Sequence, residues 1–304
     1  MTRGILHLIP AILWFCSLNQ ASGQISEPIP KLNYQAVSDF FQLPPPEHLV
    51  EPAGVAVNSK GHIYIFHRGK HPLMEFDSSG KFLRSLADDL FVTAHMVRVD
   101  SEDNIWTTDI GSHVVLKLSP DGKVLLALGR MRIPGDDVLH FNQPTDVAWD
   151  RDGNIYVADG YGNSRVVKFD RFGNPLLGWG MKGTGPGQFD TPHTIVIDDD
   201  RVYVGDRENA RIQVFDTAGK YLQQWKFGNP YSLAVGPDHR FYMADAAAGQ
   251  ILKLDAQGQV LGSFVGPPPS KGPHFDPHQI AVGSDGSIYA VEVIGWRAEK
   301  LQAE

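Results

Sequence analysis

The chain has 304 residues, of which 42% are hydrophobic and 20% are charged, a composition typical of a globular protein with a large core. Its formal net charge is −8 at pH 7, and lysine and arginine form no long run. Because phosphate backbones are bound by basic surfaces, this charge balance argues against a nucleic-acid partner.

The first two dozen residues differ in character from the rest. Arg3 supplies a positive charge, residues 5–15 form an apolar run, and residues 21–23 are small, as at a signal-peptidase cleavage site. We therefore predict a signal peptide over residues 1–23 and an exported protein, periplasmic or extracellular. No later segment approaches the roughly eighteen consecutive apolar residues that a spanning helix needs, so no membrane span is expected.

The only cysteine, Cys16, lies in this leader, which excludes disulfides from the mature chain. A mature protein without disulfides must be held together by its core and by any bound metal. We expect it to be a monomer.

One phrase recurs six times after the leader. It consists of a short apolar strand, a turn rich in Asp, Gly and Asn, and a second strand rich in β-branched and aromatic residues. The last apolar residue of the first strand recurs every 38 to 50 residues, at Val57, Val99, Trp149, Ile197, Val235 and Val282. This is the period of a propeller blade, and helical periodicity is nowhere sustained. We predict an all-β protein in which residues 24–304 form a single six-bladed β-propeller domain.

The sixth repeat ends early, because only one more strand fits after residues 288–292. A ring needs its last blade completed, since an open sheet edge invites pairing with other chains. We predict that residues 34–43 supply the missing outer strand and that the three prolines at 44–46 cross from the last blade to the first.

A histidine stands in alternate repeats, four residues before the apolar position that marks each one. The six residues at this point are, in order, Ala53, His95, Thr145, His193, Tyr231 and His278. Alternate blades of a six-bladed ring are related by about a third of a turn, so the three imidazoles should converge on the axis. A three-histidine cup is typical of catalytic zinc, although cobalt, iron or manganese accepts similar ligands. Taken singly, each histidine is better explained as a hydrogen-bonded core residue, but that explanation is weak for three histidines in register.

Three further side chains follow the second strands of their repeats. Arg68 follows His67 where other repeats place an aspartate, and its guanidinium could clamp a carboxylate, although an ordinary loop arginine fits the sequence as well. Tyr161 and Arg207 occupy a variable position after Asp159 and Asp206. A tyrosine beside a metal could act as a base once its phenol pKa is lowered.

Several motifs resemble the peptidyl-α-hydroxyglycine α-amidating lyases, which are NHL-type six-bladed propellers. The likeness spans all six repeats, and the motifs that carry it are HFNQPTDVA from His140, DGYGNSR from Asp159, GQFDTPH from Gly187 and DRENARIQVF from Asp206. The resemblance implies zinc on His95, His193 and His278, substrate-binding arginines at Arg68 and Arg207, and a catalytic tyrosine at Tyr161. It also implies a calcium ion held by the carbonyls of Val55 and Val97 and by the residue after the last zinc ligand.

The sequence departs from the family at two of these places. Gln279 replaces the aspartate that binds calcium, and losing a formal charge weakens such a site considerably. Asp276 replaces a methionine implicated at the family's active site. The family's cysteine pairs are absent too, and both partners of each pair are replaced together.

The leading hypothesis is a zinc-dependent lyase that cleaves the C–N bond of a peptidyl- or N-acyl-α-hydroxyglycine to an amide and glyoxylate. Its partner would be a small molecule or a peptide C-terminus bearing a carboxylate. Two alternatives remain: a non-catalytic binding propeller of the NHL type with a structural metal, and a lactonase or hydrolase propeller. The lactonase reading ranks last because such propellers bind calcium through axial carboxylate and asparagine side chains, where this chain has histidines.

Overall fold

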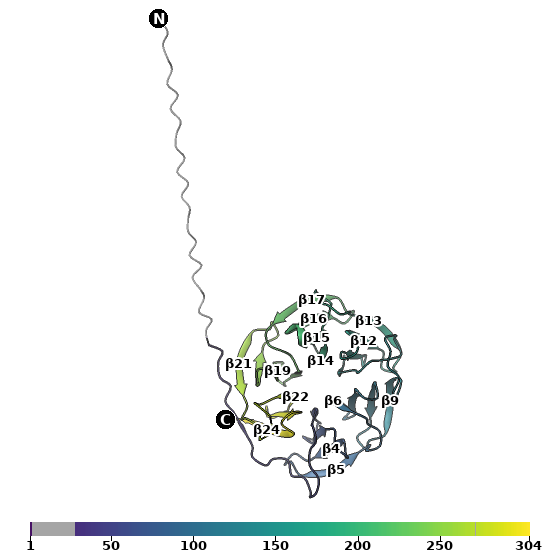
Figure 1. Ribbon diagram of the computed structural model, residues 1–304, viewed down its shortest axis with the longest axis vertical. Coiled ribbons are helices and arrows are strands. Elements are labelled where there is room, and N and C mark those ends of the chain that lie inside the picture. The colour runs from purple at the N-terminus through teal and green to yellow at the C-terminus, as the bar shows by residue number, and fades with distance from the viewer. Residues whose placement is uncertain (2–27, 271) are drawn as a thin grey trace.

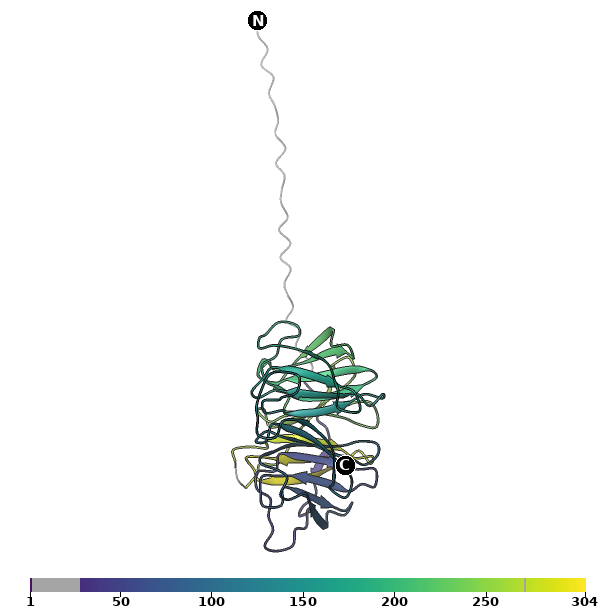
Figure 2. The same cartoon turned by 90° about the vertical axis from the view of Figure 1, so that its right-hand side faces the viewer.

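A computed structural model describes residue 1, residues 28–270 and residues 272–304. The predicted signal peptide and Cys16 lie outside the described residues after Met1. Six four-stranded antiparallel sheets surround a central axis, which confirms the predicted six-bladed β-propeller (Figure 1). Figure 2 shows the same ring from its edge.

The two inner strands of each blade carry the recurring phrase. The innermost strands line the axis and are β2 (Gly54–Val57), β6 (Ala94–Val99), β10 (Asp146–Trp149), β14 (Pro192–Asp198), β18 (Ser232–Val235) and β22 (Pro277–Val282). The second strands pair with them and are β3 (Ile63–Phe66), β7 (Ile105–Asp109), β11 (Ile155–Asp159), β15 (Arg201–Asp206), β19 (Phe241–Asp245) and β23 (Ile288–Glu292).

The two outer strands complete each sheet. The third strands are β4 (Leu73–Phe76), β8 (Val114–Leu118), β12 (Arg165–Phe169), β16 (Arg211–Asp216), β20 (Gln250–Leu254) and β24 (Arg297–Ala303). The fourth strands are β5 (Phe82–Leu86), β9 (Val124–Gly129), β13 (Pro175–Trp179), β17 (Tyr221–Lys226), β21 (Val260–Val265) and, in the last blade, β1 (Tyr34–Ala36). A single 3-10 turn, η1 (Arg207–Asn209), follows β15.

Strand β1 closes the ring, as the sequence predicted. It pairs antiparallel with β24, with Tyr34 opposite Ala303 and Ala36 opposite Leu301. The strand is shorter than the predicted range 34–43, because the chain then turns through Asp39, whose φ is 52°. Phe41 beyond this turn packs edge-on against Phe76 of the first blade, so the segment also joins the last blade to the first.

The turns between the third and fourth strands have a common chemical basis. In the first blade, the Asp77 carboxylate accepts the N–H groups of Ser79 and Lys81, and Gly80 takes a positive φ of 84° that favours glycine. Equivalent aspartates hold the β12–β13, β16–β17 and β20–β21 turns in the same way, at Asp170, Asp216 and Asp255.

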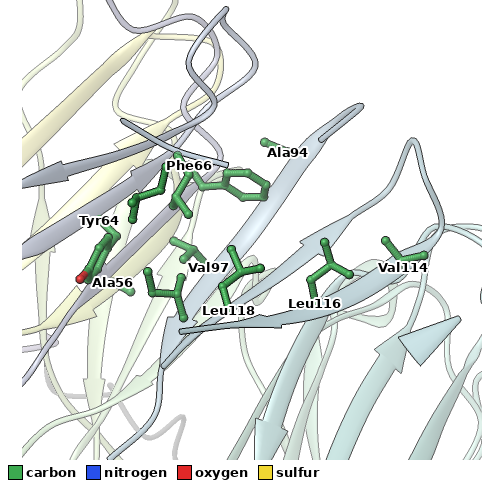
Figure 3. Packing of buried hydrophobic residues seen from close by; sticks show 11 residues of the cluster. Ala56, Tyr64, Phe66, Ala94, Val97, Val114, Leu116 and Leu118 are labelled. Carbon is green, nitrogen blue, oxygen red and sulfur yellow. The ribbon is translucent and has the colours of Figure 1, made fainter. Parts of the chain in front are cut away.

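The core lies between neighbouring blades. Between the first and second blades, Tyr64 and Phe66 of β3 pack against Val97 of β6 and Leu116 and Leu118 of β8 (Figure 3). Burying an aromatic or branched aliphatic side chain stabilises a fold by about 1.5–3 kcal/mol. These blade contacts therefore make a stiff ring that fixes the positions of the axial side chains.

Candidate metal centre and active site

Three strands that carry histidine differ from the other three innermost strands. β6, β14 and β22 have six or seven residues, whereas β2, β10 and β18 have four. Each longer strand changes register with its neighbour at its histidine: between Ala94 and Val97, between Pro192 and Thr194, and between Pro277 and Gln279. Such bulges re-aim a side chain, and here they occur where His95, His193 and His278 leave the ladder.

The three imidazoles meet on the axis. Their ring centroids are 4.9 to 5.1 Å apart, and one ligand nitrogen from each lies within 4.8 Å of the others. His95 and His193 are fully buried, and His278 is 7% exposed. Nitrogens this close, on three rigid strands, can bind one metal ion.

Backbone carbonyls fix the tautomer of each ring. The Nδ1 of His95 lies 2.6 Å from the carbonyl oxygen of Thr145, that of His193 2.6 Å from Tyr231, and that of His278 2.7 Å from Ala53. Each of these carbonyls belongs to the residue that stands, in the next blade around the ring, at the repeat position of the histidine. Since a carbonyl only accepts, Nδ1 carries the proton, and Nε2 keeps its lone pair for a metal.

Electrostatics favour the neutral rings. Burial lowers the pKa of His95 and His193 well below its usual value, with neighbouring imidazoles and Arg207 adding to the effect. Burial also lowers the pKa of His278, to about 4. Neutral imidazoles with free Nε2 atoms suit zinc, so the residues present fit this metal.

Tyr161 lies directly over the histidine cup. Its hydroxyl is 2.9 Å from Nε2 of His193 and 3.2 Å from Nε2 of His95, and it accepts a hydrogen bond of 3.3 Å from Arg207. Burial raises the pKa of the phenol, while the charges of Arg207 and Arg68 oppose this shift. The phenol that the sequence singled out is thus placed where a proton could be exchanged beside a metal.

The two arginines lie beside the cup in different surroundings. The guanidinium of Arg207 is held between two rings, 5.4 Å from the centre of Tyr161 and 4.8 Å from that of Tyr231, and it pairs with Glu208. Arg68 lines the same pocket as Tyr161 and His278, pairs with Glu51 at 2.9 Å and donates to the carbonyl of Ala94. Both can therefore reach a ligand carboxylate near the axis.

Buried acceptors at or just after the ends of the second strands hold the loops next to the cup. Asp109 accepts N–H groups from Val92, Thr93 and Ser112, and Asp159 accepts from Asn142. In the first blade His67 takes this role, and its Nδ1 accepts from Val50 at 3.2 Å. Its neighbour Arg68 is fixed as a result.

Tyr231 is a site residue that sequence reasoning missed. Its place at the same repeat position as the histidines could have suggested that it faces the axis. Its contact with Arg207, however, depends on a loop of another blade. Its ring lies 5.5 Å from that of His193 and 6.2 Å from that of His278, and it packs on Arg207.

The structure also brings together the residues expected at a calcium site, but they do not fit the ion. The buried Gln279 amide accepts N–H bonds from Val55 and Val97 at 3.0 and 3.1 Å and donates to the carbonyl of Val97 at 2.8 Å. The Gln279 NH2 group thus points at the Val97 carbonyl, which would have to bind the cation, and the amide carries no negative charge. The amide itself ties these strands together.

Fold and site define a six-bladed β-propeller with a three-histidine cup on its axis. The NHL repeat family model matches residues 141–169 and 189–215. Peptidyl-glycine alpha-amidating monooxygenase B of Xenopus laevis is 34% identical in an alignment that covers 83% of this chain and 34% of the relative. The probable peptidyl-alpha-hydroxyglycine alpha-amidating lyase pgal-1 of Caenorhabditis elegans is 34% identical and aligned over 56% of this chain and 57% of its own. The chain is therefore a homologue of proteins named as amidating lyases, and it contains NHL repeats.

The chain spans only about a third of the amphibian relative, and NHL repeat-containing protein 3 of Homo sapiens, whose name states no activity, is 35% identical over 62% of this chain and 59% of its own. A streptogramin B lyase structure has a TM-score of 0.65 at 16% identity, covering 90% of this chain and 98% of that one, and shows the fold alone.

Proposed function

We propose that the chain is a zinc-dependent lyase that cleaves the C–N bond of a peptidyl- or N-acyl-α-hydroxyglycine, giving an amide and glyoxylate. The observation that carries the proposal is the contact of the Tyr161 hydroxyl with two Nε2 atoms of the cup and with Arg207. A metal site, a proton-exchanging group and a carboxylate-binding group thus share one place.

The reaction needs one proton to move and no oxidant. The α-hydroxyl loses its proton, the C–N bond breaks as the C=O bond of glyoxylate forms, and the amide nitrogen gains a proton. Zinc held by His95, His193 and His278 would supply Lewis acidity that lowers the pKa of the substrate hydroxyl.

The protein groups would divide the remaining work. Arg207 and Arg68 bind the substrate carboxylate and hold the reacting carbon over the cup, which removes much of the entropic cost of alignment. Tyr161 accepts the hydroxyl proton, and the positive charge of Arg207 beside its oxygen favours the ionised phenol.

Glyoxylate release from a synthetic N-acyl-α-hydroxyglycine tests the proposal. Chelation should abolish release by the purified protein, and added zinc should restore it above the spontaneous rate. A folded, zinc-loaded protein that releases no glyoxylate would refute the lyase. A binding propeller with a structural metal would instead show a lower melting temperature after chelation and no turnover in either state.

We also propose that the protein is exported, on the basis of the predicted leader. No helix in residues 28–270 or 272–304 is long and apolar enough to cross a membrane. Detection of the mature chain beginning near residue 24 outside the cytoplasm would test this.

A further inference from the structure

A pocket opens from one side of the histidine cup. It has a volume of about 360 Å³, and Arg68, Tyr161, Tyr231 and His278 form its inner end. It runs outward between the loops of the fifth and sixth blades. Its volume lies in the range of small-molecule sites and exceeds what one water or metal ion requires.

The outer walls of this pocket are largely apolar. Ala246 and Ala247 follow β19, and Val293 and Ile294 follow β23. These positions correspond to those that carry Tyr161 and Arg207 in the third and fourth blades. The loops of the third and fourth blades therefore place polar side chains above the cup, whereas those of the fifth and sixth blades place alkyl side chains there.

The two polar residues of the outer wall already have partners in the protein. His274 Nε2 lies 3.0 Å from the carbonyl oxygen of Ala246. The Asp276 carboxylate accepts N–H bonds from Ile294 at 2.9 Å and from Gly295 at 3.3 Å. The wall thus offers mainly alkyl surface, and the charge of Asp276 opposes entry of an anion.

Tyr231 lies between Arg207 and the apolar pocket. Its ring packs on the guanidinium of Arg207, and the residue also lines the pocket. An α-hydroxyglycine carries its carboxylate and its acylated nitrogen on the same carbon. With the carboxylate at Arg207, the nitrogen and its acyl group would point past Tyr231 towards the fifth and sixth blades.

We infer that this pocket binds the acyl group of the substrate and selects an uncharged, apolar group over a small or anionic one. The inference rests on the proposed lyase function, and it assigns Tyr231, Ala247 and Ile294 as residues that determine specificity.

Three substrates that differ only in the acyl group test it: N-benzoyl-, N-acetyl- and N-succinyl-α-hydroxyglycine. For the zinc-loaded protein we expect kcat/KM to be at least about tenfold higher for the benzoyl than for the acetyl substrate, because a buried ring gains more than one methyl group. The succinyl substrate should be the poorest. Ala247→Trp should lower the benzoyl-to-acetyl ratio at least about tenfold by filling the pocket. Ala218→Trp, at another exposed alanine in the β16–β17 turn, is the matched control and should leave the ratio unchanged.

Binding of unreactive analogues separates this inference from the proposed reaction. By calorimetry, N-benzoylglycine should bind at least about tenfold more tightly than N-acetylglycine, and Ala247→Trp should remove the difference. If no substrate releases glyoxylate but this binding pattern holds, the lyase fails and the apolar pocket stands. Equal binding of both analogues, or a ratio unaffected by Ala247→Trp, overturns the acyl pocket even if the lyase is active.

Discussion

At the scale of single residues, the cup depends on which nitrogen of each histidine is free. The 2.6–2.7 Å contacts of the three Nδ1 atoms with backbone carbonyls leave the Nε2 atoms facing one another. Tyr161 extends this arrangement, because its hydroxyl touches two of those atoms and Arg207 holds it there.

Tyr161→Phe should lower kcat for glyoxylate release by roughly a hundredfold or more, because a positioned proton-transfer group usually accelerates a reaction by at least this factor. The ring would still pack against His193 and Arg207, so zinc content and melting temperature should stay unchanged. Tyr221→Phe on outer strand β17 is the control and should have the same activity as the unsubstituted protein. Full turnover in a folded, zinc-loaded Tyr161→Phe protein would remove the tyrosine from the reaction.

The buried histidines also predict how the chelated protein responds to pH. Burial lowers the pKa of His67, His95, His193 and His278. The unfolded chain therefore binds protons at these histidines below about pH 6.5 while the folded protein does not. Stability thus falls as the pH drops, by at most about 1.4 kcal/mol per pH unit for each histidine.

Urea unfolding of the chelated protein at pH 7, 5.5 and 4.5 measures this loss. His239, which is exposed and whose pKa is raised by Asp198, provides the control: His239→Asn should leave the pH slope below 6.5 nearly unchanged or slightly steeper. An unfolding free energy that stays constant from pH 7 to 4.5 would contradict the neutral cup.

At the scale of elements, the sequence predicted which residues face the axis but not how they are aimed there. The set of three histidines follows from register, because His95, His193 and His278 occupy equivalent places in alternate repeats. The bulges at these places leave no such signal, since they arise from how β6, β14 and β22 pair with their neighbours. Tyr231 was missed for a similar reason: its contact with Arg207 joins loops of different blades.

The Gln279 network likewise required the structure. A glutamine after a ligand histidine indicates only a lost charge, whereas its amide in fact bridges β22 to β2 and β6. Gly54 permits this approach, because a Cβ there would lie 2.9 Å from the nitrogen of Val97 and 3.1 Å from the amide oxygen. The innermost strands meet more closely here than side chains would allow.

Gln279→Ala should therefore reduce the unfolding free energy by about 1–3 kcal/mol, because it leaves buried N–H groups unsatisfied. Urea denaturation measures the change, and Gln257→Ala in the exposed β20–β21 turn should have little effect. Added calcium should not raise the melting temperature of the zinc-loaded natural protein. A large stabilisation by calcium would show that the amide yields its place to the ion.

At the scale of the whole molecule, the six repeats impose a symmetry that the site uses and then breaks. Alternate blades supply equivalent imidazoles and equivalent backbone acceptors, which gives the cup its threefold form. The loops above it are unequal, since the third and fourth blades supply Tyr161 and Arg207 whereas the fifth and sixth blades supply alkyl side chains. In the proposed lyase, this inequality would give a substrate on the symmetric histidine cup one direction of binding.

The ring itself depends on the strand that joins its two ends. Figure 1 shows the segment that begins at residue 28 passing outside β21 before it reaches β24, and Leu32 donates to the carbonyl of Ser263 on the way. Leu32, Tyr34 and Ala36 then pack on the core between the fifth and sixth blades. Both hydrogen bonds and apolar area are lost if this segment is removed.

A chain that begins at residue 38 should accordingly lose about 1–3 kcal/mol of unfolding free energy compared with one that begins at residue 28, because the partly buried Leu32 and Tyr34 and the hydrogen bonds of β1 are removed. The exposed edge of β24 should also promote association, since an unpaired strand offers its backbone to other chains. Thermal unfolding and light scattering of the two zinc-loaded proteins measure both effects. Equal melting temperatures and equal mass would mean that the ring is closed by its blade contacts and that β1 only covers its surface.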